Sequence, residues 1–204
     1  CMIVKNEEKN IRRALSWGRE LMCEQIVVDT GSTDKTVEIA MEMGAKVYHF
    51  VWCDDFSAAK NYAIEQAAGD WIAFLDADEY FSREDTEKLI DLLAEIEEGE
   101  SAEEDPHLMI RCAWVHLGED DRPISVSVQD RIFRNLPEIR YSGRIHEQIG
   151  RWGLDKGPLI CIDERKTLSI MHTGYIPSVM KEKEKRERNI QLLLREIEEN
   201  PEDL

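Results

Sequence analysis

The sequence predicts an α/β domain with a mostly parallel, mixed β-sheet flanked by helices. Short apolar runs alternate four times with segments of helical hydrophobic spacing within the first 80 residues. Parallel strands need long crossover connections, which are usually helices, so this alternation favours a parallel sheet. After residue 98 the pattern changes to two long extended segments around a polar turn, which indicates a β-hairpin.

The first half contains four strands and three intervening helices. We expect strands at 1–4, 25–28, 46–52 and 71–75, and helices within 5–21, from a cap near Thr33 to Gly44, and from 56 to Gly69. Ligands of such sheets bind at the carboxyl ends of the strands. Asp29 and Asp76 both follow a strand, and this shared position is the first indication of a site.

The second half begins with a helix over 82–98, where Ser82 and Asp85 form a capping-box pattern. Segments 107–117 and 123–135 flank GEDDR and predict the hairpin, and extended segments follow at 139–149 and 159–171. The last helix carries an apolar stripe of Ile190, Leu193, Leu194 and Ile197. We therefore divide the chain into a domain of residues 1–175, with halves 1–98 and 99–175, and a helical extension at 176–204 that suggests a longer protein.

Composition excludes several classes of function. A net charge of −17 argues against a nucleic-acid surface, and no apolar run is long enough to cross a membrane. The five cysteines are far apart and include no C-x-x-C pair, so we expect reduced thiols and a cytoplasmic protein.

The stretch WIAFLDADEY (71–80) places Asp76 and Asp78 after an apolar strand. On an extended backbone these side chains point the same way, and two close carboxylates repel unless a cation or a proton lies between them. Mg²⁺ and Mn²⁺ prefer such oxygen ligands. The structural alternative is that the pair only caps the helix near Ser82. A G-x-G-x-x-G or Walker loop is missing, and Tyr80 does not fit the Asp-x-Asp phosphatases.

Three segments together carry a family resemblance. CMIVKNEE, IVVDTGSTDKT and FSAAKNYAIEQAAGDWIAFLDADE resemble the nucleotide-sugar half of family 2 glycosyltransferases, which have the Rossmann-like GT-A fold. QDRIFRN, GRIHEQI and MHTGY resemble the subgroup with a short acceptor half, often followed by tetratricopeptide repeats. The resemblance implies metal-dependent transfer of a sugar, with inversion, from a UDP-sugar to an unidentified glycan, lipid-linked or peptide acceptor.

The resemblance also implies a nucleotide pocket. Asp29 would bind the uracil ring, and Lys60 stands where the family usually has an arginine, so it keeps the charge without the bidentate fork. The loop after the first strand would lie against the nucleotide, and the first acid of the Asp-x-Asp pair would hold the ribose. The full expected set is Val4, Asn6, Glu7, Asp29, Lys60, Asp76 and Ala77.

The expected metal ligands are Asp76, Asp78 and the late His172, with Mn²⁺ or Mg²⁺ as the ion. The ion would neutralise charge on the departing diphosphate.

The resemblance assigns the catalytic base to a late carboxylate, but the usual Glu-Asp pair is absent. Glu147 is the first candidate and Asp130 the second, although Glu147 could instead pair with Arg144 or Arg151.

Two rival functions remain at this stage. A nucleotidyltransferase would need a Gly- and Arg-rich phosphate loop, which CMIVKNEE does not supply. A non-catalytic nucleotide-sugar-binding or interaction module on the same fold is compatible with the sequence.

Overall fold

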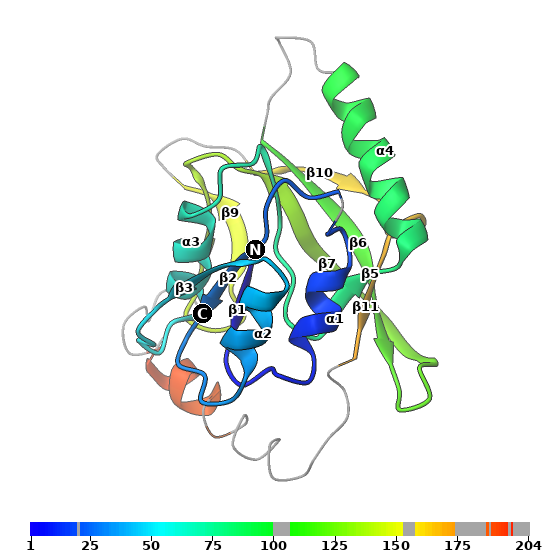
Figure 1. Cartoon of the computed structure of the whole chain (residues 1–204). Coiled ribbons are helices and arrows are strands. Elements are labelled where there is room, and N and C mark those ends of the chain that lie inside the picture. The colour runs from blue at the N-terminus through cyan, green and yellow to red at the C-terminus, as the bar shows by residue number, and fades with distance from the viewer. Residues whose placement is uncertain are drawn as a thin grey trace.

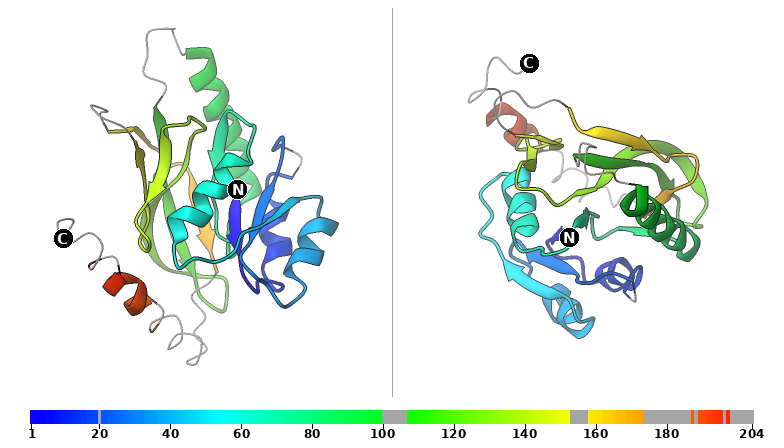
Figure 2. Two further views of the ribbon diagram at one scale, coloured as in Figure 1. Left: turned by 90° about the vertical axis from the view of Figure 1, so that its left-hand side faces the viewer. Right: turned by 90° about the horizontal axis from the view of Figure 1, so that it is seen from above.

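A computed structural model of the chain shows two larger β-sheets side by side with helices against their faces, and a separate two-stranded pair (Figure 1). It describes residues 1–19, 21–99, 107–152, 158–173, 187, 189–195 and 197. Most of the predicted extension at 176–204 lies outside these residues. Figure 2 shows the N-terminal half, in blue and cyan, beside the green and yellow strands of the second half.

The first sheet is parallel, as predicted. Its order is β1-β2-β3, and Val4 lies in register with Asp29, which in turn faces His49. The strands are β1 (Met2–Val4), β2 (Ile26–Asp29) and β3 (Lys46–His49), and the helices of this half are α1 (Ile11–Ser16), α2 (Thr36–Glu42) and α3 (Phe56–Glu65). The carboxyl ends of β1 and β2 therefore meet at one edge.

The second sheet is mixed and curled, so the expectation of a mostly parallel sheet holds only for the first sheet. Its order is β4-β7-β6-β11-β5, with β10 also paired to β6. Pairs β6–β10 and β6–β11 are parallel, whereas β4–β7, β6–β7 and β5–β11 are antiparallel. The strands are β4 (Trp71–Ala73), β5 (Glu79–Phe81), β6 (Leu108–Leu117), β7 (Pro123–Arg134), β10 (Ile160–Asp163) and β11 (Ser169–His172). The long hairpin sets this arrangement, because a tight turn permits only antiparallel pairing.

Backbone hydrogen bonds join the two sheets at the start of β1. The amino group of Cys1 donates to Ala73 O at 2.9 Å, and Leu75 N donates to Cys1 O at 3.2 Å. The two bonds follow the pattern of a parallel pair and extend the line of β4 beside β1. The acids that follow Leu75 therefore lie at the same edge as the ends of β1 and β2.

The predicted hairpin is confirmed as β6 and β7. Its register shifts between Ile110 and Arg111, which face Ile132 and Asp130, so Arg131 is the extra residue of a β-bulge. Bulges redirect side chains and are common beside active sites. A separate antiparallel pair, β8 (Ile139–Ser142) and β9 (Gln148–Arg151), follows the hairpin.

Helix α4 (Arg83–Gly99) confirms the predicted cap, because Asp85 N donates to Ser82 Oγ at 3.0 Å. Two other boundaries and one strand differ from expectation. Helix α1 ends at Ser16, since Gly18 has a φ of +63° and starts a turn. Helix α2 begins at Thr36 rather than near Thr33. Strand β5 was not predicted.

The predicted apolar stripe of the last helix is not its buried face. Ile190, Leu193, Leu194 and Ile197 are between 39% and 49% exposed, whereas Leu192 is 2% exposed. All five cysteines are free thiols, as expected. No helix within the described residues has both the length and the apolar character that a membrane span requires.

Candidate active site

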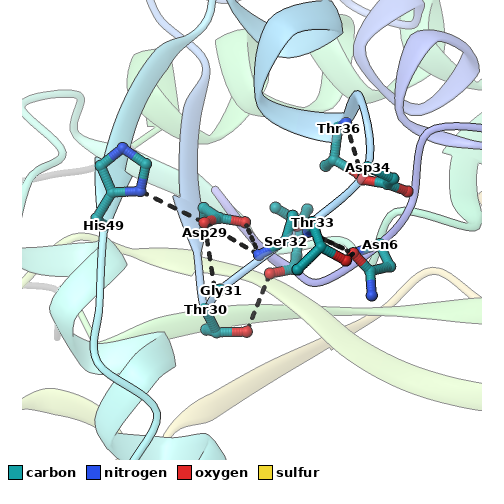
Figure 3. A network of polar contacts seen from close by, with 10 residues as sticks. Asn6, Asp29, Thr30, Gly31, Ser32, Thr33, Asp34, Thr36 and His49 are labelled. Atoms are coloured by element: carbon teal, nitrogen blue, oxygen red, sulfur yellow. Dashed lines mark hydrogen bonds and ion pairs between the residues drawn. The ribbon is translucent and has the colours of Figure 1, made fainter.

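Asp29 anchors the loop that follows β2 (Figure 3). Its side chain is buried, and its carboxylate accepts hydrogen bonds from Gly31 N at 3.2 Å and Ser32 N at 3.0 Å. Gly31 has a φ of +105°, a conformation that suits glycine and lets the chain turn back over the acid. His49 Nδ1 lies 3.4 Å from Asp29 Oδ2 and was not expected there.

The loop after β1 binds directly to the loop after β2. Asn6 Oδ1 accepts a hydrogen bond from Thr33 N at 2.8 Å, and Asn6 N donates to Ser32 Oγ at 2.9 Å. Asn6 has a φ of +58°, which asparagine tolerates better than most residues. Val4 O accepts from both the backbone and the hydroxyl of Thr30. Glu7 N donates to Thr36 Oγ1. Four of the seven expected nucleotide-binding residues therefore lie in or at the start of these two loops, which we call the loop cluster: Val4, Asn6, Glu7 and Asp29.

Asp76 is not free to act as an isolated acid. Arg131 Nη2 donates to Asp76 Oδ2 at 2.7 Å and to Glu79 Oε1 at 2.9 Å. Glu79 is fully buried, and its other oxygen accepts from the backbone of Asp76 at 2.8 Å. We call Asp76, Glu79 and Arg131 the arginine cluster. The bulge in β7 aims the guanidinium at the two acids.

The surroundings of the arginine cluster shift the pKa values of its two acids in opposite directions. Burial opposes ionisation of Asp76, but Arg131 and then Lys60 outweigh it and lower the pKa of the Asp76 carboxyl from 3.8 to about 2. Burial raises the pKa of the Glu79 carboxyl, and the charge on Asp76 adds to this effect. Burial also opposes the charge of Arg131, yet the two acids keep its pKa above the ordinary value. Asp76 is therefore an anion at neutral pH.

Lys60 and Glu147 form a buried ion pair beside this cluster. Lys60 Nζ lies 2.5 Å from Glu147 Oε1, and the two side chains are 3% and 16% exposed. The ammonium also lies over the rings of Tyr141 and Phe74, at 4.8 and 5.2 Å from their centroids. Burial works against the charge of Lys60, but nearby Asp76 and other groups leave its pKa raised. The pairing with Arg144 or Arg151 considered for Glu147 is thus replaced by a pairing with Lys60.

Asp78 and His172, two of the three expected metal ligands, lie beside each other. His172 Nε2 is 3.4 Å from Asp78 Oδ2, and Asp78 O accepts from Thr173 N. The other face of His172 contacts His116, with 3.0 Å between the two Nδ1 atoms. Within the described residues, no group of three or more His, Cys, Asp or Glu side chains could enclose a metal ion. An ion here would have two protein ligands and would need further oxygens from substrate and water, which Mg²⁺ commonly uses.

The remaining predicted residues lie apart from these contacts. Asp130 accepts two hydrogen bonds from Arg111, both at 2.8 Å. Ala77 packs into the core with Val4. Outside the predicted set, Arg134 contacts Glu97 and lies over the Trp71 ring.

Sequence reasoning missed Glu79, His116 and Tyr141, and it did not assign Arg131. Glu79 stands directly after the Asp-x-Asp pair, so its position was a usable signal. His116 and Tyr141 had no such signal, because their partners come from distant segments.

Comparison with known proteins places the chain in a family. Residues 1–99 match the family "Glycosyl transferase family 2". The chain belongs to glycosyl transferase family 2.

Two curated relatives extend the similarity beyond the matched half. The chain is 36% identical over 208 residues to the TPR repeat-containing protein Synpcc7942_0270 of Synechococcus elongatus, covering 100% of this chain and 48% of that protein. It is 32% identical over 205 residues to the SPbeta prophage-derived glycosyltransferase SunS of Bacillus subtilis, covering 98% and 46%. The chain thus spans about half the length of these relatives, and the first name agrees with the predicted subgroup.

Solved structures support the fold. Staphylococcus aureus TarS 1-349 aligns with a TM-score of 0.53 at 18% identity, covering 84% of this chain and 59% of that one. The same protein in complex with UDP aligns with a TM-score of 0.51 at 18% identity, covering 80% and 60%. At this identity the likeness concerns the α/β fold alone.

Proposed function

We propose that this chain is the catalytic domain of a glycosyltransferase that takes a sugar from a UDP-sugar donor with the help of Mn²⁺ or Mg²⁺. The observation that carries the proposal is the convergence of Asp29, Asp76 and Asp78 at the edge where β1 and β2 end, in a family 2 chain. The sugar and the acceptor are left open.

The uridine would bind at the loop cluster. The carboxylate of Asp29 accepts hydrogen bonds from Gly31 N and Ser32 N. It has further lone pairs, with which it would accept a hydrogen bond from the uracil N–H. Asp76, kept ionised by Arg131, is suited to accept from ribose hydroxyls. The UDP complex of TarS, which has a similar fold, supports this choice of nucleotide.

The donor set at Asp78 and His172 fits a divalent cation. Two ligands on adjacent positions of an octahedral Mg²⁺, with bonds of about 2.1 Å, lie about 3 Å apart. The separation of 3.4 Å between Asp78 Oδ2 and His172 Nε2 is close to this value. Asp76 is bound to Arg131, so we assign the ion to Asp78 and His172 and leave Asp76 to the nucleotide. When bound, the ion would offset the charge that develops on the diphosphate.

Glu147 is the better candidate for the base. Asp130 has its two oxygens held by Arg111, and accepting a proton would break that bidentate pair. Glu147 holds a single contact to Lys60 and is partly exposed. In an inverting transfer Glu147 would take the proton from the acceptor as the acceptor bonds to the anomeric carbon and the diphosphate leaves.

The test is a thermal-shift comparison of UDP and GDP, each with and without Mn²⁺, on the native chain, Asp78→Ala and Asp91→Ala. Asp91 lies exposed on α4 and is the matched control. A ligand at about 100 times its dissociation constant stabilises by about 2.7 kcal/mol. We expect Mn²⁺ to enlarge the UDP shift, and this enlargement to be lost only in Asp78→Ala. A Mn²⁺-dependent shift that survives in Asp78→Ala would refute the metal assignment.

One observation favours a second candidate, a nucleotide-sugar-binding module without turnover. The described residues offer no enclosed metal group, and the ion pairs of Asp76 and Glu147 already occupy both acids. Release of free sugar or transfer product from the UDP-sugar would exclude this candidate. UDP binding that is indifferent to Mn²⁺, without turnover, would support it.

A further inference from the structure

A chain of side chains continues from Asp78 into the second sheet. His172 Nδ1 contacts His116 Nδ1 at 3.0 Å, and His116 Nε2 lies 3.4 Å from Ser127 Oγ. His172 and His116 are register partners on the parallel strands β11 and β6, so the strands fix the approach of the two rings. Trp114 packs against both imidazoles, with centroid distances of 4.2 and 4.6 Å.

The contact between two Nδ1 atoms requires one donor and one acceptor. If Ser127 Oγ accepts from His116 Nε2, the Nδ1 of His116 is the acceptor and His172 must donate from its own Nδ1. The Nε2 lone pair of His172 then faces Asp78 Oδ2. Two acceptors at 3.4 Å leave a position for a cation between them.

We propose that His116 is a positioning residue that fixes the tautomer of His172 and so prepares Nε2 to bind the metal ion. The inference rests on the proposed function, because it assumes an ion at Asp78 and His172. Histidine ligands generally donate their other ring N–H to a neighbouring acceptor, and loss of that acceptor typically lowers metal affinity by about 10- to 100-fold. His116 itself does not bind the ion in this proposal.

The experiment measures Mn²⁺ affinity in the presence of saturating UDP, from the electron paramagnetic resonance signal of free Mn²⁺. His116→Phe keeps a ring beside Trp114 but removes the acceptor, and we expect about 10- to 100-fold weaker Mn²⁺ binding. His116→Asn places an amide oxygen near the position of Nδ1 and should restore most of the affinity. His107→Phe, another buried histidine beside β6, is the matched control and should bind Mn²⁺ as the native chain does.

Two further readouts separate positioning from loss of structure. UDP affinity without metal should be unchanged in His116→Phe, because the contacts of His116 among the described residues are to His172, Ser127 and Trp114 and not to the loop cluster. Nitrogen NMR of the native chain with Mg²⁺ and UDP should show His172 protonated on Nδ1. Mn²⁺ affinity of His116→Phe within about twofold of native would overturn the inference and leave the proposed function intact. Protonation of His172 on Nε2 would overturn the inference and would also remove His172 from the proposed metal site. Failure of the native chain to bind Mn²⁺ with UDP would overturn both.

Discussion

The loop cluster around Asp29 and the arginine cluster around Asp76 lie at the same edge of the fold but are built differently. In the loop cluster, acids and amides bind backbone N–H groups of neighbouring turns, as Asp29 does with Gly31 and Ser32. In the arginine cluster, charged side chains bind one another across 52 to 55 residues of sequence. The first arrangement depends on loop shape, and the second depends on charge balance inside the protein.

This difference decides how each region responds to substitution. Removing an acceptor from a turn costs roughly one hydrogen bond, because water can reach the freed N–H. Removing one member of a buried ion cluster leaves its partners charged and unsolvated, which costs far more. The four predictions below test that contrast, beginning with the largest expected effect.

Arg131→Met should lower the free energy of unfolding by about 3 to 5 kcal/mol, because Asp76 and fully buried Glu79 lose their common cation. Urea denaturation monitored by circular dichroism measures this change. Arg134→Met is the matched control, since its partner Glu97 is half exposed and a loss near 1 kcal/mol is expected. Equal losses in the two variants would mean that the burial of the arginine cluster adds nothing to the cost of removing its cation.

Lys60 and Glu147 should be energetically coupled. In a double-mutant cycle of Lys60→Met and Glu147→Gln, we expect an interaction free energy of about 1 to 3 kcal/mol, because the pair is buried and 2.5 Å apart. Denaturant unfolding of the four proteins gives the value. Additivity within about 0.5 kcal/mol would mean that the pair is not formed in solution.

Asp29→Ala should cost less, about 1 to 2 kcal/mol, because it removes the acceptor of two loop N–H groups. Asp29→Asn keeps one side-chain oxygen and should lie between Ala and native. Thermal unfolding ranks the three proteins. If Asn were as damaging as Ala, the charge of Asp29 rather than its hydrogen bonding would hold the loop.

The smallest effect concerns pH. Asp76 is ionised down to about pH 2 in the folded chain, against an ordinary value of 3.8, so the stabilisation it provides is present above pH 3.8 and is lost as pH falls toward 2. The side chain is 39% exposed, and we expect about 1 kcal/mol after screening by solvent. Unfolding free energies of native and Asp76→Asn across this window should converge at the acid end. Parallel curves would contradict the assignment.

The same contrast explains what the sequence could predict. Strands β1 and β2, the cap of α4 and the hairpin have local determinants, and each was predicted. Strand β5 begins with the acid Glu79 and lacks the apolar run that marks β1, and the end of α1 depends on the conformation of Gly18.

Within the site, Asp29, Asp76 and Asp78 could be found because each follows an apolar strand. The Lys60–Glu147 pair and the approach of Arg131 could not, because they depend on how α3, β7 and the segment before β9 pack together. The bulge at Arg131 adds a residue that simple alternation along β7 does not anticipate.

Two residues of strand β7 support the proposed site. Ser127 contacts His116, the neighbour of the proposed metal ligand His172, and Arg131 contacts Asp76, the proposed ribose ligand. The four-residue step between them spans about 13 Å. One residue inserted between Ser127 and Arg131 would move one of these two residues by about 3.3 Å along the strand and turn its side chain to the other face of the sheet. The exposed turn at 119–122 carries no such constraint. Insertions and deletions among related chains are therefore expected in the turn and excluded between Ser127 and Arg131.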